Sequence, residues 1–275
     1  DTAKHTEETI WKELKVEADK AFAEWKMANP EKVLDDNEFY MVGEVYNYSI
    51  GHARAFPMGG GDYVDFFAED FDALINFAFK YDVARNLDST YAAYSQSLST
   101  GEMSEFGVLN YLSSHDDGSP FDPDRSMPKK AGTYLLLAPG GAQIYYGDEL
   151  ARPLTYEGAE GDAHLRTYMN WDDLNGSDVY AHWSKLGKFR QAHVAVGTGI
   201  HRKITDDPYT FSRIYESDKV IIAMDVKDEI PVGDVFSEDS KVRDAYSGEI
   251  YTVTEGKIQV SGPQELVLLE PADGI

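Results

Sequence analysis

Short apolar runs alternate with stretches of helical spacing along the first two thirds of the chain. Runs rich in Val, Ile and Tyr occupy residues 39–45, 108–117 and 142–149. Runs of this length and composition are typical of strands that are buried on both faces of a sheet. Helical spacing predicts helices near residues 6–29, 87–99, 127–137 and 178–196. Strands and helices in alternation predict a parallel sheet covered by helices.

Near Gly197 the pattern changes to short alternating segments separated by turn residues. These segments are residues 210–215, 220–226, 250–254, 258–260 and 266–269. Such a pattern is typical of a small antiparallel β domain. We therefore expect an α/β part over residues 1–196 and an all-β part over residues 197–275. Two further segments are less regular: periodicity alone does not assign residues 71–79, and the glycines at 59–61 predict an irregular loop.

Acidic residues stand at the ends of the apolar runs. Glu44 ends the first run, His115 and Asp116 end the second, and Asp148 and Glu149 end the third. A carboxylate in such a position is costly to desolvate and adds nothing to packing. When the arrangement repeats at the carboxyl ends of strands separated by helices, it indicates chemistry.

The ends of these apolar runs resemble motifs of a known family. Gly43-Glu44-Val45, Ser114-His115-Asp116 and Tyr145-Tyr146-Gly147-Asp148-Glu149 are similar, in this order, to motifs of the α-amylase family of glycoside hydrolases. Asp1-Thr2-Ala3-Lys4-His5 resembles the end of that family's fourth-strand motif. The resemblance implies the C-terminal half of a (β/α)8 TIM-type barrel, from the end of strand 4 through strands 5 to 8, followed by a small antiparallel β-sandwich. It makes residues 71–79 the sixth strand and implies a missing N-terminal half of the same enzyme as a partner.

The same resemblance implies a role for each site residue. Asp1 is the nucleophile, Glu44 the acid/base, and Asp116 the third carboxylate, which stabilises the charged transition state. Retaining hydrolysis needs the carboxyl groups of nucleophile and acid about 5–5.5 Å apart. The residues implied to bind substrate are Lys4, His5, His115, Asp162 and Arg166.

The resemblance also implies calcium and a shape for the neighbouring loops. The main-chain carbonyl of His5 matches a ligand of the family's structural calcium ion, whose other ligands would lie outside this chain. Ser114 stands where the family usually has Asn, and its shorter side chain reaches less far toward a substrate. Asp148 and Glu149 are expected to shape their loop rather than react.

Charge and composition restrict the partners. The formal net charge of −24 makes nucleic acid and anionic membranes unfavourable partners, whereas a neutral α-glucan is compatible with it. Apolar runs stay shorter than the ~18 residues that a membrane helix needs, and the absence of cysteine excludes disulfides and a thiolate nucleophile. The leading hypothesis is a secreted or periplasmic retaining hydrolase that cleaves the α-1,4 bonds of starch-like glucans. An α-glucan transglycosylase and an inactive carbohydrate-binding fragment stay open as alternatives.

Overall fold

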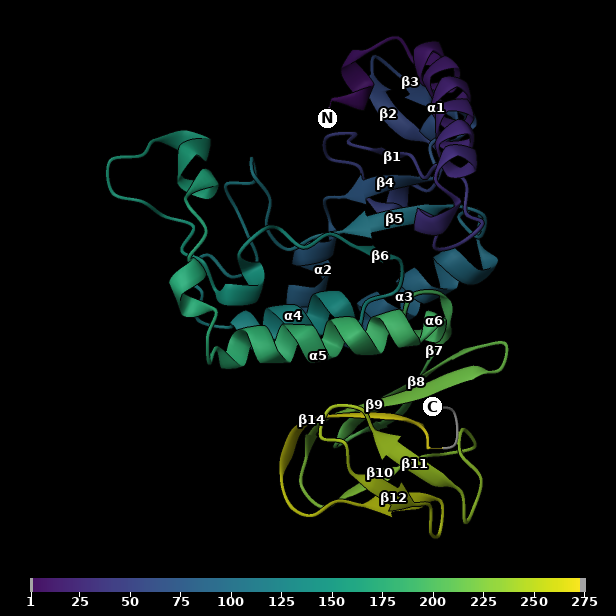
Figure 1. The fold of residues 1–275 in the computed structure, drawn as a ribbon, viewed down its shortest axis with the longest axis vertical. Helices are drawn as coiled ribbons and strands as arrows, with labels where there is room; N and C mark the ends of the chain where they lie inside the picture. Colours follow the sequence, from purple (N-terminus) through teal and green to yellow (C-terminus); the bar gives the residue numbers. More distant parts are fainter. Residues whose placement is uncertain (1, 273–275) are drawn as a thin grey trace.

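A computed structural model describes residues 2–272 of the chain (Figure 1). A parallel sheet has the strand order β1-β4-β5-β6. Its strands are β1 (Val42–Gly43), β4 (Ala73–Asn76), β5 (Gly107–Asn110) and β6 (Gly141–Ala142). The α-helices are α1 (Thr9–Ala28), α2 (Phe79–Arg85), α3 (Leu87–Thr100), α4 (Pro128–Leu136), α5 (Asp178–Ala192) and α6 (Val194–Thr198). Short 3-10 helices are η1 (Ala3–His5), η2 (Pro30–Lys32), η3 (Ile50–His52), η4 (Phe66–Glu69), η5 (Asp148–Leu150), η6 (Gly161–Arg166) and η7 (Trp171–Asp173).

The strands of the parallel sheet are shorter than the apolar runs that predict them. Residues 71–79 do contain a strand, but the chain turns into α2 at Phe79. The run at residues 142–149 contributes only its beginning to the sheet, in β6. Tyr145 and Tyr146 lie beyond it, and their hydroxyls donate hydrogen bonds to the main-chain oxygens of Leu165 and Thr167. These tyrosines therefore hold the following loop instead of extending the strand.

The glycine-rich segment forms a hairpin, so the expectation of an irregular loop is wrong there. Strands β2 (Phe56–Gly59) and β3 (Asp62–Val64) pair antiparallel. Gly60 and Gly61 form the turn with φ of 64° and 96°. Two residues with positive φ give a turn whose twist suits a hairpin, and glycine adopts this conformation without steric cost.

The remainder of the chain is antiparallel. A six-stranded sheet has the order β12-β11-β14-β9-β8-β7, and β10 pairs with β13. The bounds are β7 (Ile200–Asp206), β8 (Tyr209–Tyr215), β9 (Asp218–Val226), β10 (Glu229–Pro231), β11 (Lys241–Asp244), β12 (Ile250–Thr252), β13 (Lys257–Gln259) and β14 (Gln264–Pro271). The helix predicted over residues 178–196 is interrupted at His193, where the backbone becomes extended. The His193 ring bonds the carboxylates of Asp218 and Glu270 at 2.7 and 2.6 Å, which fixes this break.

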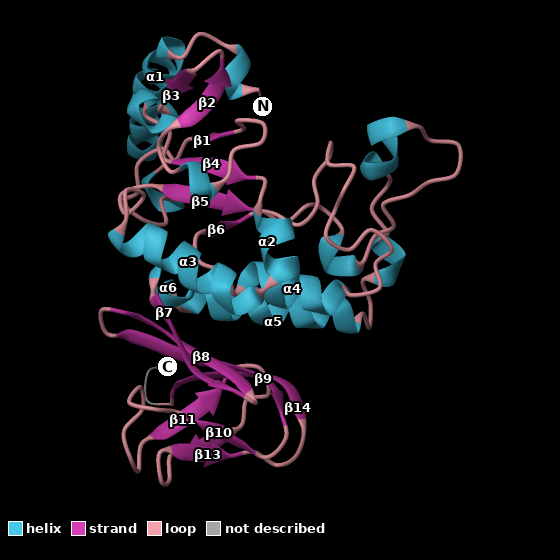
Figure 2. Cartoon of the chain, turned by 180° about the vertical axis from the view of Figure 1, so that it is seen from behind, coloured by secondary structure: helices cyan, strands magenta, loops and turns pink. Residues whose placement is uncertain are grey.

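Helices α4 and α5 lie between the two sheets (Figure 2). Neighbouring residues of a strand point to opposite faces, and β9 shows the consequence. Val220 and Ile222 join the core that runs through the helices and the parallel sheet. Ile221 and Ala223 join a second core on the far face of the antiparallel sheet. Both faces of this sheet are therefore buried, and one of them shares its core with the helices.

Helix α1 is the exception to this packing. Ile10, Leu14 and Trp25 are 43%, 51% and 45% exposed, although their spacing is that of one helix face. Trp11 does pack, with its ring 5.5 Å from that of Phe71. Much of the apolar surface of α1 thus stays uncovered by residues 2–272.

Candidate active site

Polar residues follow the carboxyl ends of the parallel strands. Glu44 comes directly after β1, His115 and Asp116 lie on the loop after β5, and Asp148 follows β6. The arrows of β4 and β5 point toward the side from which the long loop of residues 151–177 projects (Figure 1). Because parallel strands present their carboxyl ends at the same edge, these residues belong to one side of the sheet.

Glu44 is half-buried and holds the N-terminal segment against the end of β1. Its carboxylate oxygen Oε2 accepts a hydrogen bond from the main-chain nitrogen of Thr2 at 2.5 Å. Its main-chain oxygen accepts one from Ala3 at 2.8 Å. Asp1 lies outside the described residues, so its role as nucleophile stays a prediction.

Lys4 and His5 differ in their surroundings. The Lys4 ammonium donates to the main-chain oxygen of Tyr46 at 3.1 Å and lies 5.1 Å from the centre of the Tyr46 ring. His5 is exposed at the end of η1. Residues 2–272 contain no group of three or more His, Cys, Asp or Glu side chains that could hold a metal ion. The role of the His5 main-chain carbonyl as a calcium ligand stays a prediction.

The loop after β5 is held by contacts on both sides of the predicted third carboxylate. Asp116 Oδ1 accepts a hydrogen bond from Ser114 Oγ at 2.9 Å, and Asp116 Oδ2 lies 3.6 Å from His115 Nε2. Arg166 Nε donates to the main-chain oxygen of His115 at 3.0 Å. Arg166, predicted to bind substrate, thus contacts the loop that carries Asp116. Asp162 is exposed and lines a different hollow with Pro120 and Pro123.

Asp148 is a structural residue in this arrangement. Its side chain is 3% exposed. Its carboxylate accepts hydrogen bonds from Ser113 Oγ at 2.6 and 2.7 Å and from Arg125 Nη2 at 2.6 Å. Glu149 Oε2 accepts from the main-chain nitrogen of Gly147 at 2.9 Å. Both acids hold loops in place, and Asp148 ties the loop after β6 to the loop after β5.

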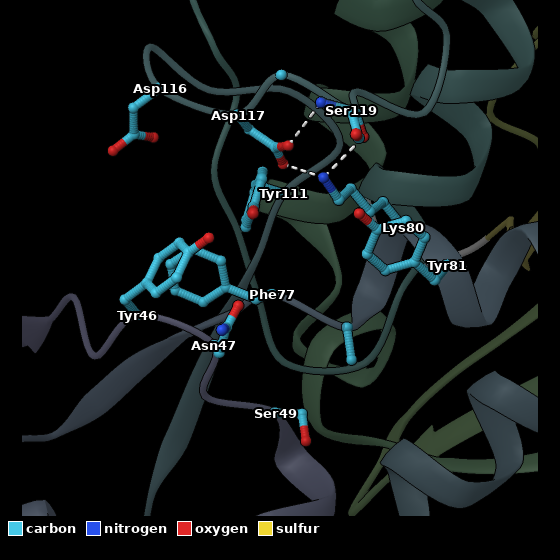
Figure 3. Close-up of a pocket in the computed structure, with 12 residues that line it drawn as sticks. Tyr46, Asn47, Ser49, Phe77, Lys80, Tyr81, Tyr111, Asp116, Asp117 and Ser119 are labelled. Carbon is cyan, nitrogen blue, oxygen red and sulfur yellow. Dashed lines mark hydrogen bonds and ion pairs between the residues drawn. The ribbon is translucent and has the colours of Figure 1, made fainter. Parts of the chain in front are cut away.

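A hollow of about 450 Å³ opens beside Asp116. Aromatic rings and carboxylates line it (Figure 3), among them Tyr46, Phe77, Tyr81, Tyr111, Asp116 and Asp117. The Phe77 ring meets the Tyr46 and Tyr111 rings edge-on, at centroid distances of 5.4 and 5.6 Å. Burial, together with the nearby Asp117 carboxylate, raises the pKa of Tyr111. Apolar ring faces beside hydrogen-bonding groups suit a sugar, which has both kinds of surface.

Sequence reasoning missed several residues of this hollow. Tyr46, Lys80, Tyr81 and Asp117 line it but belong to none of the motifs that indicate the site. Asp117 had a signal, since it directly follows Asp116. Lys80 had a weaker one: a cation directly after the predicted sixth strand.

Comparisons with known proteins bear on this site. No protein-family model matches the chain. The chain is 37% identical over 231 residues to the periplasmic alpha-amylase of Escherichia coli strain K12, an alignment that covers 81% of this chain and 31% of that protein. The chain belongs to the α-amylase family of glycoside hydrolases. A cyclomaltodextrinase of a Bacillus species is 24% identical over 217 residues, which cover 72% of this chain and 34% of that protein.

Several solved structures resemble the fold of this chain. The alpha-amylase of Geobacillus thermoleovorans, solved in complex with acarbose, matches 99% of this chain and 59% of its own at a TM-score of 0.66 and 18% identity. AmyP, solved with maltose, matches 100% of this chain and 64% of its own at a TM-score of 0.63 and 16% identity. These structures share the fold. The chain spans about a third of the length of the curated relatives it matches.

The named relatives are glycoside hydrolases, and one of them is periplasmic. Over residues 2–272 the α-amylase-family chain has no helix long and apolar enough to cross a membrane.

Proposed function

We propose that this chain is the part of a retaining glycoside hydrolase that holds its acid/base and its third carboxylate. The substrate is a starch-like glucan, cleaved at α-1,4 bonds. One observation carries the proposal. In a chain 37% identical to an alpha-amylase, Glu44 directly follows β1 and binds the nitrogen of Thr2, while the loop after β5 of the same sheet carries His115 and Asp116.

The reaction has two displacements. In the first, the Asp1 carboxylate attacks the anomeric carbon while Glu44 gives its proton to the glycosidic oxygen, so the carbon–oxygen bond breaks and a glycosyl ester forms on Asp1. In the second, the Glu44 carboxylate takes a proton from water as that water attacks the same carbon and frees Asp1. Two inversions give net retention. Asp116 stabilises the positive charge that develops on the sugar ring.

The substrate-binding residues have supporting contacts. His115 lies on the Asp116 loop, and Arg166 bonds that loop through the His115 carbonyl. Lys4 lies over the Tyr46 ring beside the hollow. His5 and Asp162 are exposed to solvent. The relatives solved with maltose and acarbose support an α-glucan as the ligand class.

We also propose how the whole enzyme is built. Residues 1–196 form part of a (β/α)8 barrel, and residues 197–275 form the β-sandwich. Within residues 2–272, β1 and β6 are the edges of the parallel sheet, and a barrel leaves no such edge. Further strands of the same enzyme would close the sheet and cover the exposed apolar face of α1. The carbonyl of His5 would add one ligand to a structural calcium ion, and the enzyme would be secreted or periplasmic.

Glu44→Gln in the intact enzyme tests the activity. Glutamine keeps the shape of the side chain but cannot protonate a leaving oxygen, so release of reducing ends from starch should fall by about 10²–10⁴. Glu24→Gln, on the exposed surface of α1, is the matched control and should hydrolyse at the normal rate.

Product analysis completes the test. NMR of fresh products should show the α-anomer first, because retention keeps the configuration of the bond. Full activity of Glu44→Gln, or a β-anomer as first product, contradicts the proposal. Products longer than the substrate would indicate a transglycosylase, and glucan binding without turnover would indicate a carbohydrate-binding protein.

A further inference from the structure

Lys80 is a buried cation beside the hollow. It lies in the first turn of α2, and its side chain is 4% exposed. Its ammonium forms an ion pair with the carboxylate of Asp117 and donates a hydrogen bond to the main-chain oxygen of Ser119 at 2.7 Å (Figure 3). The rings of Tyr81 and Tyr111 lie 4.7 and 5.8 Å from the same nitrogen. An ammonium has three donors and no acceptor, and these neighbours suit it.

This contact joins two different loops of the sheet. Lys80 follows β4, whereas Asp117 and Ser119 lie on the loop after β5. Asp117 Oδ1 also accepts a hydrogen bond from the nitrogen of Ser119 at 2.9 Å, so residues 117–119 form a closed turn. The Lys80 ammonium binds this turn at the Asp117 carboxylate and at the Ser119 main-chain oxygen. The Asp117 side chain is 12% exposed, and ion pairs sheltered from water are stronger than those on the surface.

The turn of residues 117–119 begins directly after Asp116. The Asp116 side chain is 44% exposed and faces the hollow without touching Lys80 (Figure 3). On the preceding side, Arg166 holds the carbonyl of His115. The main chain is therefore held immediately before and shortly after Asp116, whose side chain lines the hollow.

We propose that Lys80 is a positioning residue: its ion pair with Asp117 and its hydrogen bond to Ser119 hold the loop that presents Asp116 to the glucan. This inference rests on the proposed hydrolase function. Lys80 itself does not touch the reacting atoms. It acts through the loop, so its loss should change turnover more than substrate affinity.

A set of three variants separates positioning from simple stability. Lys80→Met keeps the length of the side chain but strands the Asp117 carboxylate, which lowers the unfolding midpoint as well as turnover. Lys80→Met/Asp117→Asn removes the stranded charge, so the unfolding midpoint should return close to that of the unchanged protein. Lys257→Met, whose ion pair with Glu229 is on the surface, is the control and should change neither property.

The double variant gives the decisive measurement in the intact protein. If Lys80 positions the loop, kcat on maltooligosaccharides stays about 10–100-fold low in the double variant even though stability recovers, since small displacements of a reacting group cost about that much. KM should change by less than about threefold. A double variant with normal kcat overturns the inference, because Lys80 would then only neutralise Asp117.

Hydrogen exchange tests the same inference without activity. The amides of residues 115–119 should exchange faster in the double variant, while those of β5 keep their protection. Unchanged exchange in that loop overturns the inference whatever the enzyme does. If Glu44→Gln had no effect on starch hydrolysis, the proposed function would be refuted. The exchange measurement would still test whether Lys80 holds the loop of residues 115–119.

Discussion

At the scale of single residues, the buried carboxylate of Asp148 stabilises the fold through its ion pair with Arg125. Asp148→Ala leaves Arg125, whose side chain is 9% exposed, as a buried charge without its carboxylate. Breaking a buried pair from one side costs about 3–5 kcal/mol, and the Ser113 hydroxyl loses its acceptor as well. We expect a decrease of that size in the free energy of unfolding, measured by urea denaturation.

Asp234→Ala is the matched control for this prediction. Asp234 also pairs with an arginine, Arg202, at 3.7 Å, but both side chains are largely exposed. Exposed pairs contribute little, so the urea midpoint should not move. Equal effects of the two substitutions would show that the Asp148 contacts do not stabilise the fold.

At the scale of elements, two glycines in neighbouring helices should respond in opposite ways to the same change. A Cβ at Gly132 in α4 would lie 2.8 Å from Cε2 of Trp183, a ring buried between α4 and α5. Gly132→Ala should therefore destabilise the protein by about 1–3 kcal/mol through overpacking. A Cβ at Gly187 in α5 meets no atom within 4 Å, so Gly187→Ala should stabilise by up to about 1 kcal/mol. The thermal unfolding midpoints of both variants test this prediction. A stabilising effect of Gly132→Ala would contradict the close contact between α4 and α5.

The sequence predicted elements better than their bounds. Apolar runs located β1, β5 and β6, because buried strands need apolar side chains on both faces, whereas β4 was indicated only by the family resemblance. They could not show where β6 ends, since Tyr145 and Tyr146 are apolar enough to continue a strand but bond the following loop instead. The break at His193 likewise depends on Asp218 and Glu270, carboxylates that are distant in sequence.

The candidate site divides in the same way. Motifs indicated Glu44, His115 and Asp116, because residue type and local order are written in the sequence. The ion pair of Lys80 with Asp117 joins residues 37 positions apart, and the hydrogen bond from Arg166 to His115 joins residues 51 positions apart. Such contacts follow from how the loops fold over the sheet edge, so no local pattern reveals them.

For the whole molecule, one buried histidine links stability to pH. His201 on β7 donates from Nε2 to Asp88 of α3 at 3.0 Å and accepts at Nδ1 from Arg213 Nε at 3.1 Å. Burial and the neighbouring Arg213 guanidinium lower the pKa of His201 to about 4 from its usual 6.5. At a pH between these two values, His201 is therefore mostly neutral in the folded protein and mostly protonated in the unfolded chain.

The direction of the pH effect follows from this difference. Above pH 6.5 His201 is neutral in both states and its contribution is complete; between pH 6.5 and about 4 the unfolded chain binds the proton first, so the free energy of unfolding falls as pH falls. His201→Gln can keep one donor and one acceptor but does not titrate. Urea unfolding at pH 8, 6 and 4.5 should show a smaller loss of stability in the variant, and parallel losses would contradict the assignment.

The antiparallel sheet buries both faces, one of them against the helices. That arrangement limits how the C-terminal part can be exchanged between relatives. A chimera that received strands β7 to β14 from another enzyme would also need the matching surfaces of α3 and α6, which contact β7 and β8, and the partner of Tyr246 on α5, His182. We expect such chimeras to be soluble only when the junction is moved ahead of α3, so that the helices travel with the sheet. We therefore expect the sheet and its helices to be exchangeable only as one unit.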